Sequence, residues 1–158
     1  VVAHGSTRSD AVGRLALDRF FTEYLHLGKQ VEIDQKVHST EAEMSMLGTT
    51  HAHVGGYVAA EWNLPYHLIK VICCHHDPSM SRDHTRLASV IHLASAICNY
   101  LKFGTSGEVV RQAPDDSALN KSLLKLGVGP QVLGQFIDMG ESQLEAAERF
   151  YERLMELA

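Results

Sequence analysis

The 158-residue sequence has little cysteine, no long apolar run and no excess of positive charge, and each shortage excludes a class of protein. Three cysteines, of which Cys73 and Cys74 are adjacent, cannot build a disulfide framework, so we interpret all three as reduced thiols. No apolar run approaches the roughly 20 residues of a membrane-spanning helix, so we expect no membrane association. The net charge of -5 does not favour phosphate backbones, so we expect no nucleic acid partner.

What the sequence does contain is typical of a globular chain, with 45% hydrophobic and 21% charged residues. It has no segment of the signal-peptide type, which favours a cytoplasmic location. The chain begins with Val1 rather than Met, so we interpret it as a piece of a longer polypeptide. Small polar residues predict a flexible segment over residues 1–10 and a folded domain over 11–158.

Helical spacing of apolar residues dominates the sequence, and we find no β-type alternation, no internal repeat and no Gly-rich phosphate loop. Gly28 and Gly48 are predicted to end helices, Thr40 and either Thr49 or Thr50 to begin them, and Pro65 to open another. Helices are predicted over 15–24, 40–47, 51–62, 65–76, 85–102, 117–126, 130–138 and 141–157, with loops over 29–36, 79–83 and 104–116. The predicted fold is therefore an all-α bundle of about six to eight helices.

Ten histidines stand out, and we single out four on the central predicted helices as candidates: His53, His75, His76 and His92. Imidazole is the commonest protein ligand for transition metals, so a cluster of this kind suggests a metal site. No two of the four have the i, i+4 spacing of a helical metal site. The alternative interpretation is a set of hydrogen-bonded core histidines.

The order of these residues resembles the HDOD domain, a degenerate branch of the HD phosphohydrolase superfamily found in bacterial signalling proteins. The resemblance covers about residues 12–150 and only the later part of the family's domain. It rests on Glu43-x3-Leu47-Gly48, His53-Val54-Gly55, Trp62-x-Leu64-Pro65, His75-His76-Asp77-Pro78 and Ile91-His92-Leu93-Ala94. The glycine pair at 55–56 predicts close approach of a neighbouring helix, and Trp62 is predicted to anchor the core.

The resemblance implies that the hydrolase chemistry is lost. Active members of the superfamily bind metal through a His, an adjacent His-Asp pair and a later Asp, often with further histidines. This chain has Asp10-Ala11 at the first place and His92 at the second, whereas His53 and the His75-His76 pair match extra histidines of two-metal members. The resemblance therefore implies a non-catalytic output or regulatory module without a cofactor. Its implied partners are receiver, diguanylate-cyclase or phosphodiesterase domains.

Two alternatives remain open. One is a metal-dependent phosphohydrolase, or a metal- or nucleotide-binding domain of the HD type. A divalent transition metal would then be held by the four histidines with Glu43 or Asp77. The other is a ligand-sensing face of small and polar residues on the helix over 85–102, namely Ala88, His92, Ser95, Ala96 and Asn99, whose simpler explanation is close helix packing.

The last predicted helix has a single apolar seam. Its members, Leu144, Ala147, Tyr151, Leu154 and Ala158, are three or four residues apart. Part of this seam must pack on the domain's own core. If the preceding helices of the family domain are absent, other apolar surface is left uncovered, and such surface is typical of association sites. We expect a homodimer through the last or the first helix, the alternative being a monomer whose last helix folds back along the bundle.

Overall fold

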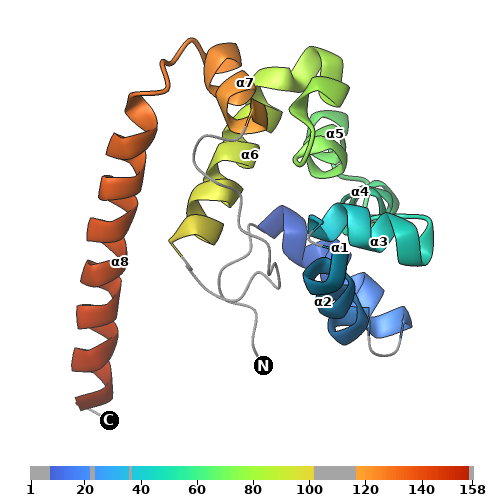
Figure 1. Ribbon diagram of the computed structural model, residues 1–158, viewed down its shortest axis with the longest axis horizontal. Coiled ribbons are helices and arrows are strands. Elements are labelled where there is room, and N and C mark those ends of the chain that lie inside the picture. Colours follow the sequence, from blue (N-terminus) through green and yellow to red (C-terminus); the bar gives the residue numbers. More distant parts are fainter. Residues whose placement is uncertain (1–7, 22–23, 36, 102–116, 157–158) are drawn as a thin grey trace.

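The computed structural model describes residues 8–21, 24–35, 37–101 and 117–156, and the described residues form helices and no strand. The all-α prediction is therefore confirmed (Figure 1). The elements are α1 (Arg8–Phe20), α2 (Tyr24–Gln35), α3 (Ser39–Leu47), α4 (His51–Glu61), α5 (Tyr66–Cys74), the 3-10 helix η1 (Pro78–His84), α6 (Thr85–Tyr100), α7 (Ser117–Leu126) and α8 (Val132–Glu156).

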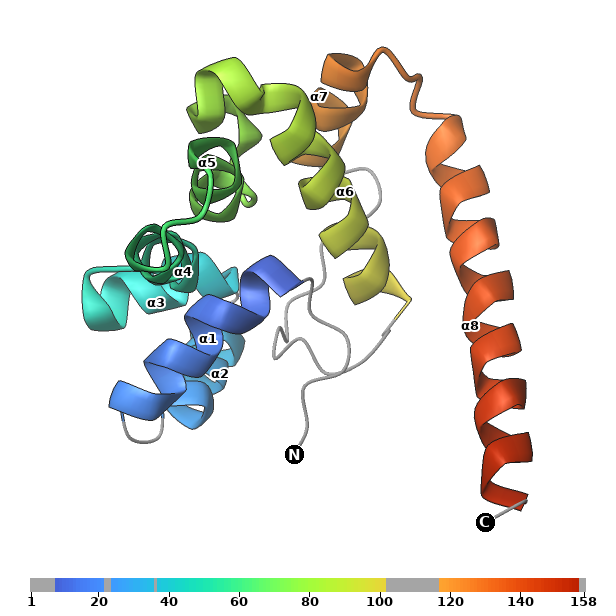
Figure 2. The same ribbon diagram turned by 180° about the vertical axis from the view of Figure 1, so that it is seen from behind.

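The helices form two neighbouring groups. In the first group α1 packs on α4, α4 on α5, and α2 on α3. In the second group α6 packs on α7 and α8, and η1 joins the groups because it contacts both α5 and α6. Seen from behind, α8 is the outermost helix, at the far side of α6 from α1 and α2 (Figure 2).

Several predicted helix ends are confirmed. Thr50 caps α4, because its side-chain oxygen accepts a hydrogen bond from the backbone N–H of His53. Gly48 ends α3 with φ of 67°, a left-handed conformation that favours glycine. Pro65 immediately precedes α5, as expected for a residue that fixes φ and lacks an N–H.

Other boundaries were predicted wrongly. Gly28 does not end a helix but lies inside α2, which runs through most of the predicted loop over 29–36. α3 begins at Ser39, so Thr40 is inside it, and the cap residue His38 makes no side-chain capping bond. The predicted loop over 79–83 is the 3-10 helix η1. The loop predicted over 104–116, and residues 1–7 of the predicted flexible segment, lie outside the described residues, while α1 already begins at Arg8.

The last two predicted helices are one continuous helix, α8. The break was predicted near Gly140, but this glycine is a packing position. A Cβ placed there would lie 2.5 Å from Leu101 Cδ1, so the missing side chain admits Leu101 to the surface of α8. Of the predicted apolar seam, Leu144 is half-buried, and the side chains of Ala147, Tyr151, Leu154 and Ala158 lie outside the described residues.

Close approach of backbones holds the first group together. A Cβ on Gly13 of α1 would lie 1.8 Å from the carbonyl oxygen of His51 in α4. A Cβ on Gly56 would lie 2.0 Å from Cys73 Sγ in α5. The predicted close approach at the glycine pair is thereby confirmed, whereas Trp62 is 65% exposed and does not anchor the core.

Candidate functional site

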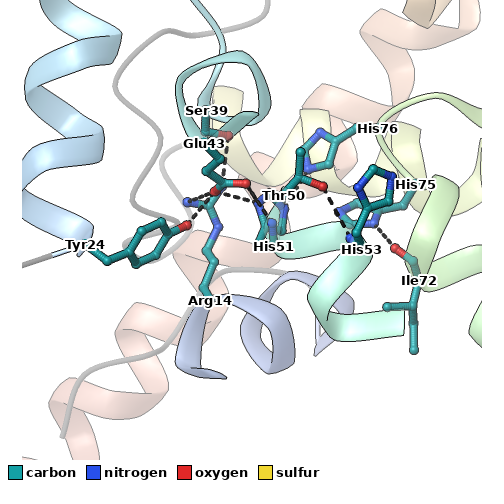
Figure 3. A network of polar contacts seen from close by, with 10 residues as sticks. All are labelled: Arg14, Tyr24, Ser39, Glu43, Thr50, His51, His53, Ile72, His75 and His76. Atoms are coloured by element: carbon teal, nitrogen blue, oxygen red, sulfur yellow. Dashed lines mark hydrogen bonds and ion pairs between the residues drawn. The ribbon is translucent and has the colours of Figure 1, made fainter. Parts of the chain in front are cut away.

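Glu43 is the centre of a buried polar network. It is only 2% exposed, and negatively charged groups are rarely buried without partners. Its carboxylate accepts a hydrogen bond from Tyr24 Oη. It also accepts one from the backbone N–H of His51, at 2.7 Å, and contacts His51 Nδ1 at 2.8 Å. Figure 3 shows these side chains converging on the carboxylate.

Three helices, α1, α2 and α4, supply the partners of Glu43, which itself lies on α3. Arg14 of α1 places Nη1 3.9 Å from the carboxylate and donates from Nη2 to Ser39 Oγ of α3, at 3.0 Å. Tyr24 is the first residue of α2. His51 is the first residue of α4, so the carboxylate lies at the positive end of that helix. The network therefore ties α1 to α4 together around one charge.

The network changes the acidity of its members. Burial favours the neutral form of Glu43, but hydrogen bonds and electrostatic attraction from His51, with a further bond from Tyr24, outweigh it and lower the pKa of Glu43. Burial and the neighbouring Glu43 carboxylate raise the pKa of Tyr24 well above its ordinary value. Glu43 is therefore the ionised member and Tyr24 a neutral donor.

The network continues from Glu43 through His51 to His76. His51 Nε2 lies 2.9 Å from His76 Nε2, so one proton lies between the two rings. Because Nδ1 of His51 donates to the carboxylate, a neutral His51 carries a lone pair on Nε2 and accepts from His76. Glu43, His51 and His76 thus form a continuous line of hydrogen bonds from the core toward the surface, where His76 is half-buried.

His75 and His92 flank this line, and each has one ring nitrogen fixed by a backbone carbonyl. His75 Nδ1 lies 2.7 Å from the oxygen of Ile72, and His92 Nδ1 lies 2.8 Å from the oxygen of His75. A carbonyl only accepts, so Nδ1 carries the proton in both rings. In the neutral form each ring then has its lone pair on Nε2.

The chemistry of this cluster fits a metal ion. One ring nitrogen from each of His51, His75 and His76 lies within 4.8 Å of the other two. Metal-bound histidines typically donate their second nitrogen to a carboxylate or a carbonyl, as His51 does to Glu43 and His75 does to Ile72. Imidazole nitrogens suit zinc and other borderline transition metals.

The structure replaces one of the four predicted histidines. The His53 side chain is exposed, and its backbone N–H donates a hydrogen bond to Thr50 Oγ1. His51 lies where His53 was predicted to lie, because residues two apart on a helix point to nearly opposite sides. A signal for His51 was present: Gly55 and Ala59, both buried, follow it at intervals of four, which is the spacing of one helix face.

The other predicted positions divide between the network and the scaffold. Glu43, His75, His76 and His92 lie in or beside the network, whereas Asp77 accepts hydrogen bonds from the backbone and hydroxyl of Ser79 at the start of η1. The predicted ligand-sensing face on α6 is mostly buried packing surface: Ala88, His92, Ser95 and Ala96 are at most 6% exposed. Such burial is typical of close helix packing, the simpler explanation for this face.

These features define a class of protein: an all-α domain whose central helices bring histidines and one carboxylate together. Residues 10–78 match the family model of the HDOD domain. Over these residues the chain is therefore similar to the HDOD domain, the family that the sequence motifs predicted.

The fold of the chain is also similar to a solved structure. A crystal structure of an HDOD domain protein with unknown function from Geobacter sulfurreducens matches with a TM-score of 0.59 and 16% sequence identity. The match covers 88% of this chain and 58% of that one, so the chain spans less than two thirds of its relative. No curated protein matches. Within the part of the chain that the structure describes, no helix is both long and apolar enough to cross a membrane.

Proposed function

We propose that this HDOD-like domain is a non-catalytic regulatory module of bacterial signal transduction that acts through protein contacts. The observation that supports the proposal is the arrangement of carboxylates around the histidines. Where the hydrolases have their later Asp the chain has His92, whose Nδ1 is bound to the backbone oxygen of His75. The site thus lacks the carboxylate that would bridge two cations and hold a water between them.

The two nearby carboxylates are engaged elsewhere. Glu43 accepts from Tyr24 and twice from His51, and Asp77 accepts twice from Ser79. Recruiting either one to a metal pair would break bonds that hold helices in place. We therefore interpret the buried network as a device that fixes the relative positions of α1, α2, α3 and α4.

Exposed aromatic residues at the turn between α4 and α5 supply a contact surface. Trp62 is 65% exposed and Tyr66 63% exposed, with Leu64 between them. Trp and Tyr are enriched at protein interfaces, where they provide large contact area. In this proposal the partners are receiver, diguanylate-cyclase or phosphodiesterase domains of bacterial signalling proteins.

Site-specific photocrosslinking tests the proposal. A photoreactive residue is placed at Trp62, at Tyr66 and, as the control, at the exposed Leu124 of α7, and each variant is produced in the native host. We expect adducts with a signalling domain of the named classes from the first two positions and none from the third. In parallel, the purified protein should not hydrolyse bis-p-nitrophenyl phosphate in manganese. Turnover that disappears in His51→Ala would overturn the non-catalytic assignment.

The histidine cluster favours metal binding as a second candidate function. A cation would be held by His51, His75 and His76 and would replace the proton between the two Nε2 atoms. Untagged protein is equilibrated with zinc, dialysed and analysed by mass spectrometry. We expect about one zinc per chain in the wild type and in His53→Ala, and loss of zinc in His76→Ala. Equal zinc in all three proteins, or none in the wild type, would exclude this candidate.

We also expect self-association through the first or the last helix. Phe20 of α1 is 81% exposed and the adjacent Phe21 is 44% exposed, and exposed apolar surface of this kind is typical of association sites. Light scattering should give a dimer for the wild type and a monomer for Phe20→Glu. A monodisperse wild-type monomer at high concentration would contradict this expectation.

A further inference from the structure

A cavity of about 360 Å³ lies where η1, α6 and α7 meet, and it shares His76 with the network around Glu43. The turn after α5 and η1 provide one wall, α6 the second and α7 the third. Most of its lining residues have polar or charged side chains, although their carbon atoms contribute the larger part of the lining surface: His76, Asp77, Pro78, Ser79, Thr85, Ser89, Lys121, Ser122 and Lys125. The volume is in the range of small-molecule sites.

The charged groups of this cavity favour an anion. Lys121 and Lys125 are one helical turn apart on α7, so their ammonium groups project from the same face. Asp77 is the single carboxylate among the described residues that line the cavity, and its Oδ1 already accepts from the backbone and hydroxyl of Ser79. Two positive charges therefore face one negative charge that is already hydrogen-bonded.

A buried hydroxyl gives an independent indication of a ligand. Ser89 of α6 is 0% exposed, and its Oγ has no hydrogen-bond partner among the described residues. Leaving a buried polar group without a partner costs about 1–3 kcal/mol, so such groups are rare without a reason. Ser122, 2% exposed, places a second hydroxyl on the opposite wall. Both hydroxyls can donate to a ligand oxygen between α6 and α7.

The geometry points to a binding site for the phosphoryl group of a small phosphate monoester. Such a group carries a charge of about -1.5 to -2 at neutral pH and three strong acceptor oxygens. The two lysines, partly offset by the Asp77 carboxylate, attract the negative charge, and the lysines and two buried serine hydroxyls offer donors to the three oxygens. A carboxylate has only two oxygens and would leave more of these donors without an acceptor. The remaining cavity volume accommodates the organic part of the ester.

His76 connects this phosphoryl site with the buried network. It lines the cavity, and its Nε2 lies 2.9 Å from His51 Nε2, which leads to Glu43. An occupied cavity therefore has a short path of hydrogen bonds to the helices that Glu43 ties together. The phosphoryl site does not depend on the proposed regulatory function, because its residues on α6 and α7 take no part in the crosslinking surface.

Calorimetric titration in the presence of a chelator tests the site with two probes of the same ring, phenyl phosphate and benzoate. We expect phenyl phosphate to bind at least tenfold more tightly than benzoate. The double variant Lys121→Gln/Lys125→Gln should weaken phenyl phosphate at least tenfold, and Ser89→Ala at least threefold. The matched control is Lys29→Gln on α2, an exposed lysine far from the cavity in the sequence, which should leave the affinity unchanged.

Three results would overturn the site. The first is equal affinity for the two probes, and the second is unchanged phenyl phosphate affinity in the double lysine variant. The third is a loss of phenyl phosphate affinity in Lys29→Gln as large as in the double lysine variant, which would indicate a diffuse effect of net charge. Circular dichroism verifies that each variant is folded. Because both lysines are exposed, their replacement leaves the core intact and the comparison stays informative. Failure of this experiment would leave the crosslinking and hydrolysis tests unaffected.

Discussion

The cores of the two helical groups are organised differently. The first group is organised around charged and polar side chains, with Glu43, His51 and Arg14 all at most 8% exposed. The second group has an apolar cluster in which α6, α7 and the start of α8 contribute the buried residues Leu93, Ala96, Leu119, Leu123 and Leu133. The chain therefore uses two different physical solutions within one domain.

The difference lies in how specific each solution is. Hydrophobic burial is non-directional and scales with area, so the apolar cluster needs shape and volume more than particular residues. A buried charge needs hydrogen-bond donors at fixed positions. Removing one donor leaves the charge with an uncompensated desolvation penalty. The first group should therefore tolerate fewer substitutions than the second, and the following experiments test that comparison in order of expected effect.

The largest effect is expected from Gly13→Ala. The new Cβ would lie 1.8 Å from the backbone oxygen of His51, and no side-chain rotation can relieve a contact with the backbone. The α1–α4 contact must open, so we expect a loss of more than about 3 kcal/mol in the free energy of unfolding. Urea unfolding measures it. Gly134→Ala in α8 meets nothing within 4 Å and should be neutral or stabilising.

The next largest effect is expected from a substitution in the polar core, compared with one that changes the side-chain volume as little in the apolar core. Glu43→Gln keeps the shape but removes the charge and turns an acceptor oxygen into a donor facing His51. We expect a loss of about 3 kcal/mol, against less than about 1.5 kcal/mol for Leu123→Met in the apolar cluster. Glu41→Gln, on the exposed side of the same helix α3, is the control and should change stability by less than about 0.5 kcal/mol. Equal losses in the two cores would contradict the comparison.

Acid should weaken the polar core selectively. The pKa of Glu43 is lower in the folded state than its ordinary value of 4.5, so its stabilising contribution is present above that pH and is lost as pH falls through the folded-state pKa. The stability difference between wild type and Glu43→Gln should therefore shrink as pH falls below about 4.5. Thermal unfolding at a series of pH values measures that difference. A difference that stays constant down to pH 3 (roughly one and a half units below the ordinary value) would refute the lowered pKa.

The smallest effect is expected at high pH. The pKa of Tyr24 is raised above its ordinary value of 10.0, so its contribution is present below that pH and is lost as pH rises further. Tyr24→Phe should cost about 1.5 kcal/mol at neutral pH, and its deficit relative to wild type should shrink above about pH 10. Tyr57→Phe is the control, since Tyr57 is 69% exposed, and it should show neither change.

The sequence predicted the helical class and much of the helix order, because periodic apolar residues, the Thr50 cap and the Gly48 stop are local signals. It also singled out Glu43, His75 and His76, which the structure places in or beside the buried network and which lie within the residues 10–78 that match the family model. It failed where a glycine serves packing rather than termination. Gly140 admits Leu101, so α8 continues through it.

The tertiary structure alone decided which histidine joins Glu43. His51 and His53 lie in one helix two residues apart, which is about 200° around the helix axis, and both are histidines. The close contact of Gly13 with the backbone of His51 sets the rotation of α4 against α1 and brings the His51 ring to Glu43. Composition and motifs determine that a histidine network can form, but the direction of each ring depends on which helix faces touch, and that is fixed by contacts between residues far apart in the chain.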